Sequence, residues 1–136
     1  MRIPRGRVLG SAAAASVRDA VLQAVDSRLT GYLSVKGQGV IILDEGRILG
    51  AVAFRDRTVR GEEFLRKLLP TTADIEAHAL DDVEMVILTR ALGIDQGADL
   101  SHVLAPQRRE ELLRRYGIRE PTEMEVESII KKALEE

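Results

Sequence analysis

The run of residues 29–54, LTGYLSVKGQGVIILDEGRILGAVAF, constrains the fold of this chain more than any other segment. Its apolar residues predict three β-strands, at 32–36, 40–43 and 48–54, which are joined by two tight turns that contain glycine. Strands joined by turns this short run antiparallel to their neighbours. The segment therefore predicts a β-meander.

The third predicted strand has no polar face. Apolar side chains are expected on both of its sides, one set being Ile48, Val52 and Phe54 and the other Leu49, Ala51 and Ala53. A strand that is apolar on both sides must be covered on both sides. Either helices of this chain lie on both faces of the sheet, or a second subunit covers one face.

Helical patterns flank the meander. Apolar residues at helical spacing predict a helix over 16–28 before it and another helix, stopped by Pro70, after it. A strand over 73–79 follows, and then a helix between the capping residue Asp81 and Gly93. The apolar residues expected along that last helix are Val83, Val86, Ile87 and Ala91. We therefore predict an α+β fold, an antiparallel β-meander flanked by helices, with a helical C-terminal tail.

The order of these elements predicts three parts. The α+β domain is expected to occupy residues 1–93, and the glycine and aspartate residues of 94–105 are typical of a linker. Residues 106–136 are expected to form the helical tail. An apolar stripe runs along its last helix and comprises Val126, Ile129, Ile130, Ala133 and Leu134. This stripe either forms a docking or dimerisation interface, or folds back to cover the sheet.

The composition excludes several classes of protein. The chain has no cysteine, so neither disulfides nor thiolate metal sites can form. No apolar run approaches the roughly 20 residues of a membrane-spanning helix, and the N-terminal alanine stretch is too short and too polar for a signal peptide. We therefore expect a cytoplasmic protein that contacts no membrane.

The charges are divided unevenly along the chain. Residues 1–60 carry ten basic and five acidic side chains, whereas residues 61–136 carry ten basic and seventeen acidic ones. Such asymmetry orients the encounter with a partner. The acidic second half and the scarcity of aromatic residues argue against nucleic acid as that partner.

Three short motifs of the predicted domain match those of a known family. A strand motif is formed by Thr30, Gly31 and Leu33, a turn motif by Asp44, Gly46, Arg47 and Ile48 with Glu45 inserted, and a helix motif by Gly61 and Phe64. Over residues 16–92 the chain resembles the PATAN-type domain, in an archaeal branch known only as a domain of unknown function. The resemblance implies a small α+β module for regulatory protein contacts, and it transfers no catalytic residue.

Arg55, Arg57 and Arg60 form the most suggestive cluster of side chains. They lie between the last meander strand and the start of the next helix, where guanidinium groups and free backbone N–H groups together can hold an anion or an acidic partner. The alternative is a solvated loop whose arginines pair with neighbouring carboxylates. We favour the solvated loop and keep the anion or acidic-partner site as the alternative.

The second candidate is the strand face that carries Asp74, Glu76 and His78. Their spacing offers three ligands to a divalent metal ion, but the same residues suit a strand face in contact with water. We adopt the second interpretation, and His102 in the expected linker has no better claim to a metal. No metal and no cofactor are expected.

The sequence contains no motif with a defined catalytic mechanism. No nucleophile has an activating base beside it, and neither glycine-rich turn has the spacing of a phosphate loop. We therefore expect a non-enzymatic protein-interaction or regulatory module, which binds a protein partner or itself as a homodimer. The alternatives, in descending order, are a small-molecule or anion-binding sensor that uses the loop near Arg57, and an enzyme of unknown type.

Overall fold

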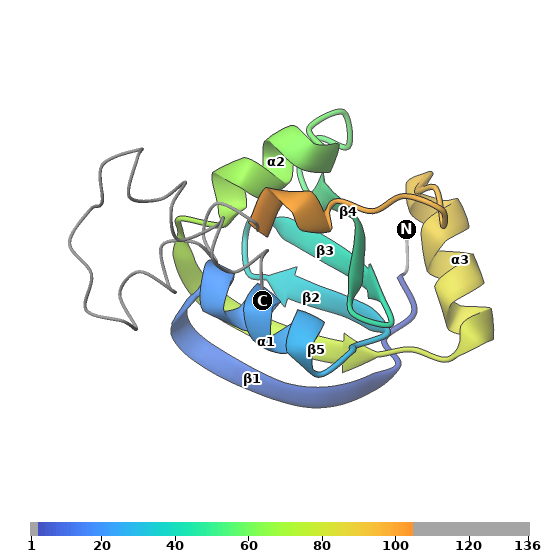
Figure 1. The fold of residues 1–136 in the computed structure, drawn as a ribbon, viewed down its shortest axis with the longest axis horizontal. Helices are drawn as coiled ribbons and strands as arrows, with labels where there is room; N and C mark the ends of the chain where they lie inside the picture. Colours follow the sequence, from blue (N-terminus) through green and yellow to red (C-terminus); the bar gives the residue numbers. More distant parts are fainter. Residues whose placement is uncertain (1–2, 105–136) are drawn as a thin grey trace, which may run out of the picture. The chain divides into compact units, whose positions relative to one another are not determined.

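The computed structural model describes residues 3–104 of the 136-residue chain. In this part a five-stranded antiparallel sheet is combined with three α-helices, which confirms the predicted α+β class (Figure 1). The elements are β1 (Arg7–Ser16), α1 (Val17–Asp26), β2 (Gly31–Val35), β3 (Gly39–Asp44), β4 (Arg47–Ala53), α2 (Gly61–Leu68), β5 (Thr72–Ala79), α3 (Asp82–Leu92) and the short 3₁₀ helix η1 (Ser101–Leu104). The expected tail at 106–136, with its apolar stripe, lies outside the described residues.

The strands are arranged in the order β1-β5-β2-β3-β4. The consecutive antiparallel pairs β2–β3 and β3–β4 are the predicted meander. β5 returns to lie between β2 and β1, so that Tyr32 pairs with Ile42 on one side and with His78 on the other. The two edges of this sheet are β1 and β4.

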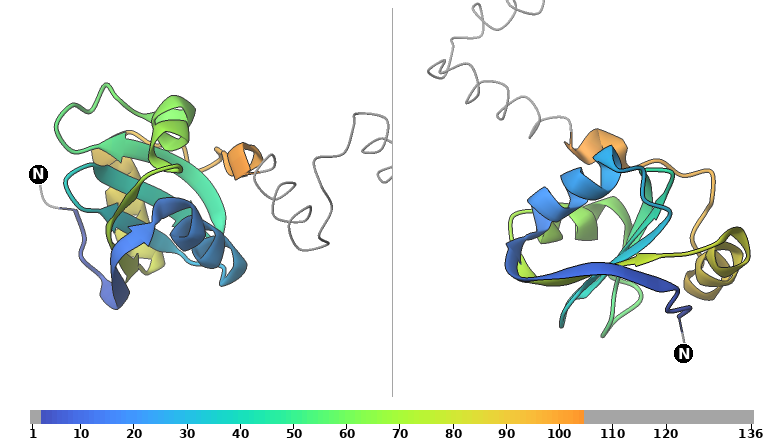
Figure 2. Two further views of the ribbon diagram at one scale, coloured as in Figure 1. Left: turned by 90° about the vertical axis from the view of Figure 1, so that its left-hand side faces the viewer. Right: turned by 90° about the horizontal axis from the view of Figure 1, so that it is seen from below.

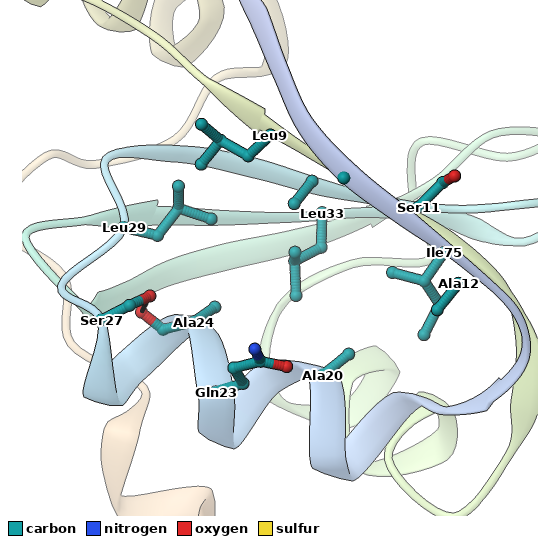
Figure 3. A pocket seen from close by; sticks show the side chains of 12 residues that line it. Leu9, Ser11, Ala12, Ala20, Gln23, Ala24, Ser27, Leu29, Leu33 and Ile75 are labelled. Atoms are coloured by element: carbon teal, nitrogen blue, oxygen red, sulfur yellow. Dashed lines mark hydrogen bonds between the residues drawn. The ribbon is translucent and has the colours of Figure 1, made fainter.

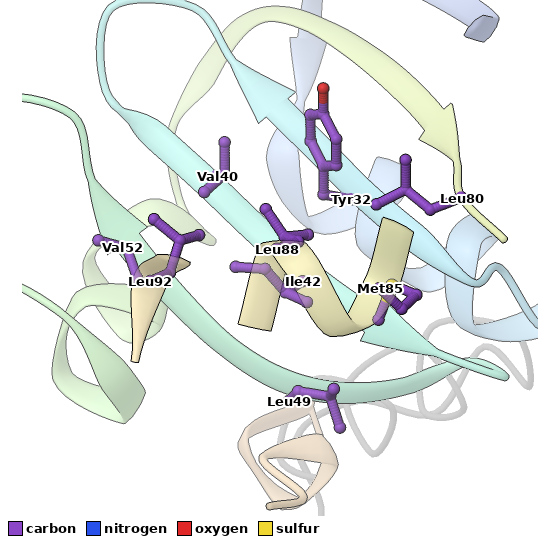
Figure 4. Packing of buried hydrophobic residues seen from close by; sticks show 9 residues of the cluster. All are labelled: Tyr32, Val40, Ile42, Leu49, Val52, Leu80, Met85, Leu88 and Leu92. Atoms are coloured by element: carbon purple, nitrogen blue, oxygen red, sulfur yellow. The ribbon is translucent and has the colours of Figure 1, made fainter. Parts of the chain in front are cut away.

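Helices of the same chain lie on both faces of the sheet. α1 and α2 cover one face of the sheet and α3 covers the opposite face (Figure 2). Leu33 and Ile41 belong to the face of α1 and α2, whereas Tyr32 and Ile42 belong to the face that packs on α3. Figure 4 shows the α3 side of the core, where the helix contributes Met85, Leu88 and Leu92. Of the two arrangements expected for the apolar ribbon, the chain adopts the one in which its own helices provide the cover.

β1 is an edge strand that the sequence pattern did not predict. Its residues, RVLGSAAAAS, are mostly small and show no alternation of apolar and polar side chains, and eight of the ten are exposed. The strand is held by antiparallel pairing with β5 and is interrupted by two irregularities of register. The position of such a strand is set by backbone hydrogen bonds to its neighbour. Its sequence therefore shows no hydrophobic periodicity from which the strand could be predicted.

A β-bulge in β4 changes which side chains share a face. Ile42 pairs with Gly50 but Leu43 pairs with Ile48, so Leu49 is an extra residue in its strand. Leu49 consequently joins Val52 in the core cluster below α3. The expected grouping, which placed Leu49 and Val52 on opposite faces, was wrong because strict alternation ignores the bulge.

The segment after Gly93 packs on the domain as far as Val103. Ile94 lies against the core cluster, Leu100 N donates to Ile48 O at 2.7 Å, and Arg47 Nη2 donates to Gln96 O at 3.0 Å. The compact unit accordingly runs to Val103, beyond the boundary expected at residue 93. No helix within residues 3–104 is long and apolar enough to cross a membrane.

Candidate interaction surface

The structure separates Arg60 from the other two arginines of the predicted cluster. Arg60 Nη2 donates to Leu92 O and, at 3.0 Å, to Gly93 O. These carbonyl groups lie at the C-terminal end of α3, where helical acceptors lack partners within the helix. Arg60 therefore closes the end of α3, while Arg55 and Arg57 are exposed in the loop before α2.

Two carboxylates near this loop, Asp56 and Glu62, have partners other than Arg55 and Arg57. Asp56 accepts hydrogen bonds from the Thr58 hydroxyl at 2.6 Å and from Thr58 N at 3.0 Å, and these bonds lower the pKa of Asp56. Glu62 accepts from Arg66 at 2.7 Å and lies 3.0 Å from the ring of His102, and both contacts lower the pKa of Glu62. The binding of an anion by Arg55 and Arg57 stays a prediction.

His78 is buried, with only 4% of its surface exposed, so the expectation that it faces water was wrong. Its Nδ1 lies 2.7 Å from Arg5 O and its Nε2 lies 2.6 Å from Glu76 Oε1. The ring therefore has a polar partner at each of its two nitrogens, one in the backbone and one in a side chain. The physical reason for the burial is that the N-terminal segment and the Tyr32 ring cover this end of β5.

The three residues weighed as metal ligands do not form a ligand set. Asp74 is exposed, accepts a hydrogen bond from Ala14 N at 2.9 Å, and lies 3.9 Å from Lys36 Nζ. Glu76 instead contacts His78, deeper in the structure. Across the described part of the chain, no group of three potential ligands is placed to hold a metal ion.

The outer face of α3 is an apolar surface that sequence reasoning missed. Val83 is 68% exposed, Ile87 is 49% exposed and Val86 is 37% exposed, although all three lie on a helix whose opposite side is in the core. α3 therefore presents aliphatic side chains on its solvent-facing side, where a surface helix normally carries charged or polar ones. The outer face is therefore a candidate contact surface.

The ends of α3 are well defined, which gives this face a rigid support. Asp81 accepts from Glu84 N at 2.8 Å, and the Glu84 side chain accepts from Asp81 N at 3.2 Å, which completes a capping box. At the other end Gly93 adopts the left-handed conformation that commonly ends a helix, with a φ of 66°. Both caps agree with the sequence prediction.

A groove of about 300 Å³ lies on the opposite side of the sheet, between β1 and α1 (Figure 3). The strand leads directly into the helix at Ser16, so the two elements diverge from a common point. Leu33 and Ile75 line the groove from the sheet, and Gln23 lines it from α1. On the β1 side Gly10 contributes no side chain, and a Cβ added there would have no heavy atom within 4 Å.

Comparison with known proteins links the chain to an archaeal protein. A protein of Archaeoglobus fulgidus, described as uncharacterized, is 27% identical to it over 161 aligned positions, which cover 99% of this chain and 64% of the relative. The chain thus spans less than two thirds of the length of that protein. No protein-family model matches the chain, and no solved structure matches it.

Proposed function

We propose that this protein is a non-enzymatic, cytoplasmic interaction module whose contact surface is the outer face of α3. The observation that carries the proposal is the exposure of Val83, Val86 and Ile87 on a helix that is otherwise part of the core. Apolar side chains gathered on one surface are a mark of protein contact sites. The regulatory role implied by the PATAN-type resemblance agrees with a module of this kind.

The chemistry of the surface defines the partner that it fits. Along α3, the carboxylate of Asp82 lies at the N-terminal end of the surface, three aliphatic side chains form its middle, and the guanidinium of Arg90 lies at its C-terminal end. A complementary surface presents an apolar strip, a base opposite Asp82 and an acid opposite Arg90. These requirements describe a folded protein surface with charges at both ends of an apolar strip.

Site-specific photocross-linking tests the proposal. The full chain carries a benzophenone amino acid at Val83 and is incubated with an extract of the source organism, and the matched control carries it at Val59, an exposed valine outside α3. We expect a cross-linked protein, either a second copy or another chain, from position 83 alone. The additional substitution Ile87→Glu should abolish that product. If no protein is cross-linked at position 83, the proposal is wrong.

The groove between β1 and α1 favours a second candidate function, the binding of a small apolar molecule. Its volume lies at the lower end of the range for ligand sites, and its lining is mostly aliphatic with Gln23 at the side.

An NMR titration with octanoate as the probe tests this second function. Binding should shift the amides of Ala20 and Ala24, and Ala12→Leu, which fills the groove, should abolish the shifts. Unchanged amide positions at millimolar octanoate would rule this function out.

A further inference from the structure

We propose that the partner of α3 is the α3 of a second copy of the chain, packed against it in antiparallel orientation. This inference rests on the proposed function, because it names the partner of the same surface. It is carried by the way in which charge and apolar area are distributed along the outer face. That distribution is complementary to itself in one orientation only.

Residues four apart form ridges along a helix. On the outer face of α3 one ridge consists of Asp82, Val86 and Arg90, which places an acid, an aliphatic side chain and a base in line. The neighbouring ridge begins with Val83 and Ile87, which widen the apolar middle. Each end of the charged ridge lies about 6 Å along the axis from Val86, because a helix rises 1.5 Å per residue.

A two-fold axis beside Val86 satisfies both charges at once. It places Asp82 of each copy opposite Arg90 of the other, and it brings the two Val86 side chains together in the centre. A parallel arrangement would instead place like charges side by side. The antiparallel pair also brings the negative end of each helix dipole next to the positive end of the other. Charge complementarity therefore selects the antiparallel pair.

The other carboxylate in the first turn of α3 does not disturb this pattern. The side chain of Glu84 accepts a hydrogen bond from Asp81 N and is held in the capping box. Asp82 is exposed at the start of the helix and lies on the same ridge as Arg90.

One helix pair presents a small contact area. We therefore expect the two copies to associate with a dissociation constant in the micromolar range, on the order of other small interfaces.

Cysteine cross-linking tests the geometry directly, because the chain contains no cysteine of its own. The full chain with Val86→Cys should form a disulfide-linked dimer under mild oxidation. Val83→Cys should not, because the two residues 83 would be about 9 Å apart along the axis alone, beyond the reach of a disulfide. Val59→Cys is the exposed control. Equal cross-linking at 83 and 86 would indicate parallel packing and overturn the proposal.

A charge-reversal series tests the pairing of Asp82 with Arg90. Asp82→Arg alone and Arg90→Asp alone should each weaken dimerisation of the full chain at least about threefold in sedimentation equilibrium, in line with the strength of exposed ion pairs. The double variant should restore it, because the reversed charges again face each other across the axis. Both changes oppose the helix dipole and weaken the monomer, so this recovery cannot come from stability.

Three outcomes separate this inference from the proposed function. A chain that stays monomeric at all concentrations, or a double variant no better than the single ones, would overturn self-association. If position 83 nevertheless cross-links a different protein, the interaction module stands and only its partner was misassigned. If position 83 cross-links nothing, both proposals fail.

Discussion

The imidazole ring of His78 lies flat on the phenol ring of Tyr32, with the ring centroids 4.5 Å apart and the planes inclined by 8°. The two residues are paired across β5 and β2, on the face of the sheet that packs on α3. The imidazole also contacts the N-terminal segment at Arg5 O. One stacked pair thus connects two central strands with the segment that leads into the edge strand β1.

Replacing His78 by phenylalanine should destabilise the protein by about 1–3 kcal/mol, because the aromatic contact is kept but the acceptors at Arg5 and Glu76 lose their partner. Urea unfolding followed by circular dichroism measures the change in the free energy of unfolding. His102→Phe is the matched control, since the side chain of His102 is largely exposed, and its effect should stay within about 0.5 kcal/mol. Equal effects of the two substitutions would contradict the burial of His78.

Tyr32 should make the protein sensitive to alkaline pH. Burial first, and then the charge of Glu76, raise the pKa of Tyr32 above its ordinary value of 10.0. With the folded pKa above the unfolded one, the contribution to stability is complete below pH 10.0 and is lost as the pH rises from there through the folded pKa.

Phenolate absorbance measures this titration. In a Tyr116→Phe variant Tyr32 is the remaining tyrosine, and it should ionise at higher pH in the folded protein than in urea. Tyr32→Phe should remove the corresponding loss of stability at alkaline pH. Identical titration curves in the folded and unfolded states would show that burial does not act on this group.

Replacing Arg60 by methionine should destabilise the end of α3. The change keeps most of the aliphatic stem but removes the hydrogen bonds to Leu92 O and Gly93 O, at a cost of about 1–3 kcal/mol. Hydrogen exchange of the last amides of α3 should accelerate. Arg57→Met, an exposed neighbour, should leave both the exchange and the stability unchanged, and an equal effect would show that Arg60 does not act through α3.

The meander could be predicted from sequence because its turns impose their own residue requirements. A side chain at Gly31 would place Cβ 1.9 Å from His78 O, and Gly46 adopts a φ of 78° where its N donates to Leu29 O. Thr30 Oγ1 accepts from Glu45 N at 3.0 Å, which joins the turn before β2 to the turn before β4. Gly31, Gly46 and Thr30 therefore serve backbone geometry, which explains why these positions indicate a fold.

The outer face of α3 could not be assigned from sequence because the helix carries two apolar stripes of the same period. Val83, Val86 and Ile87 were expected in the same stripe, and Met85, Leu88 and Leu92 form the other. Helical periodicity locates a stripe but does not say which of two stripes faces the sheet. Only the packing of Met85 and Leu88 on the core decides this, and it leaves the expected stripe exposed.

Gly39 tests how closely α2 and β4 pack around the start of β3, and Gly10 in the edge strand β1 is its control. A Cβ at Gly39 would lie 2.3 Å from Val52 O and 2.8 Å from the ring of Phe64, so backbone and side chain would both have to move. Gly39→Ala should therefore destabilise the protein by at least about 2 kcal/mol, as overpacked sites do. Gly10→Ala meets nothing within 4 Å and should leave the stability unchanged or raise it by up to about 1 kcal/mol. Urea midpoints of the two variants measured side by side decide the matter, because a Gly39→Ala variant as stable as the parent protein would mean that Val52 O and the ring of Phe64 do not pack on Gly39 in this way.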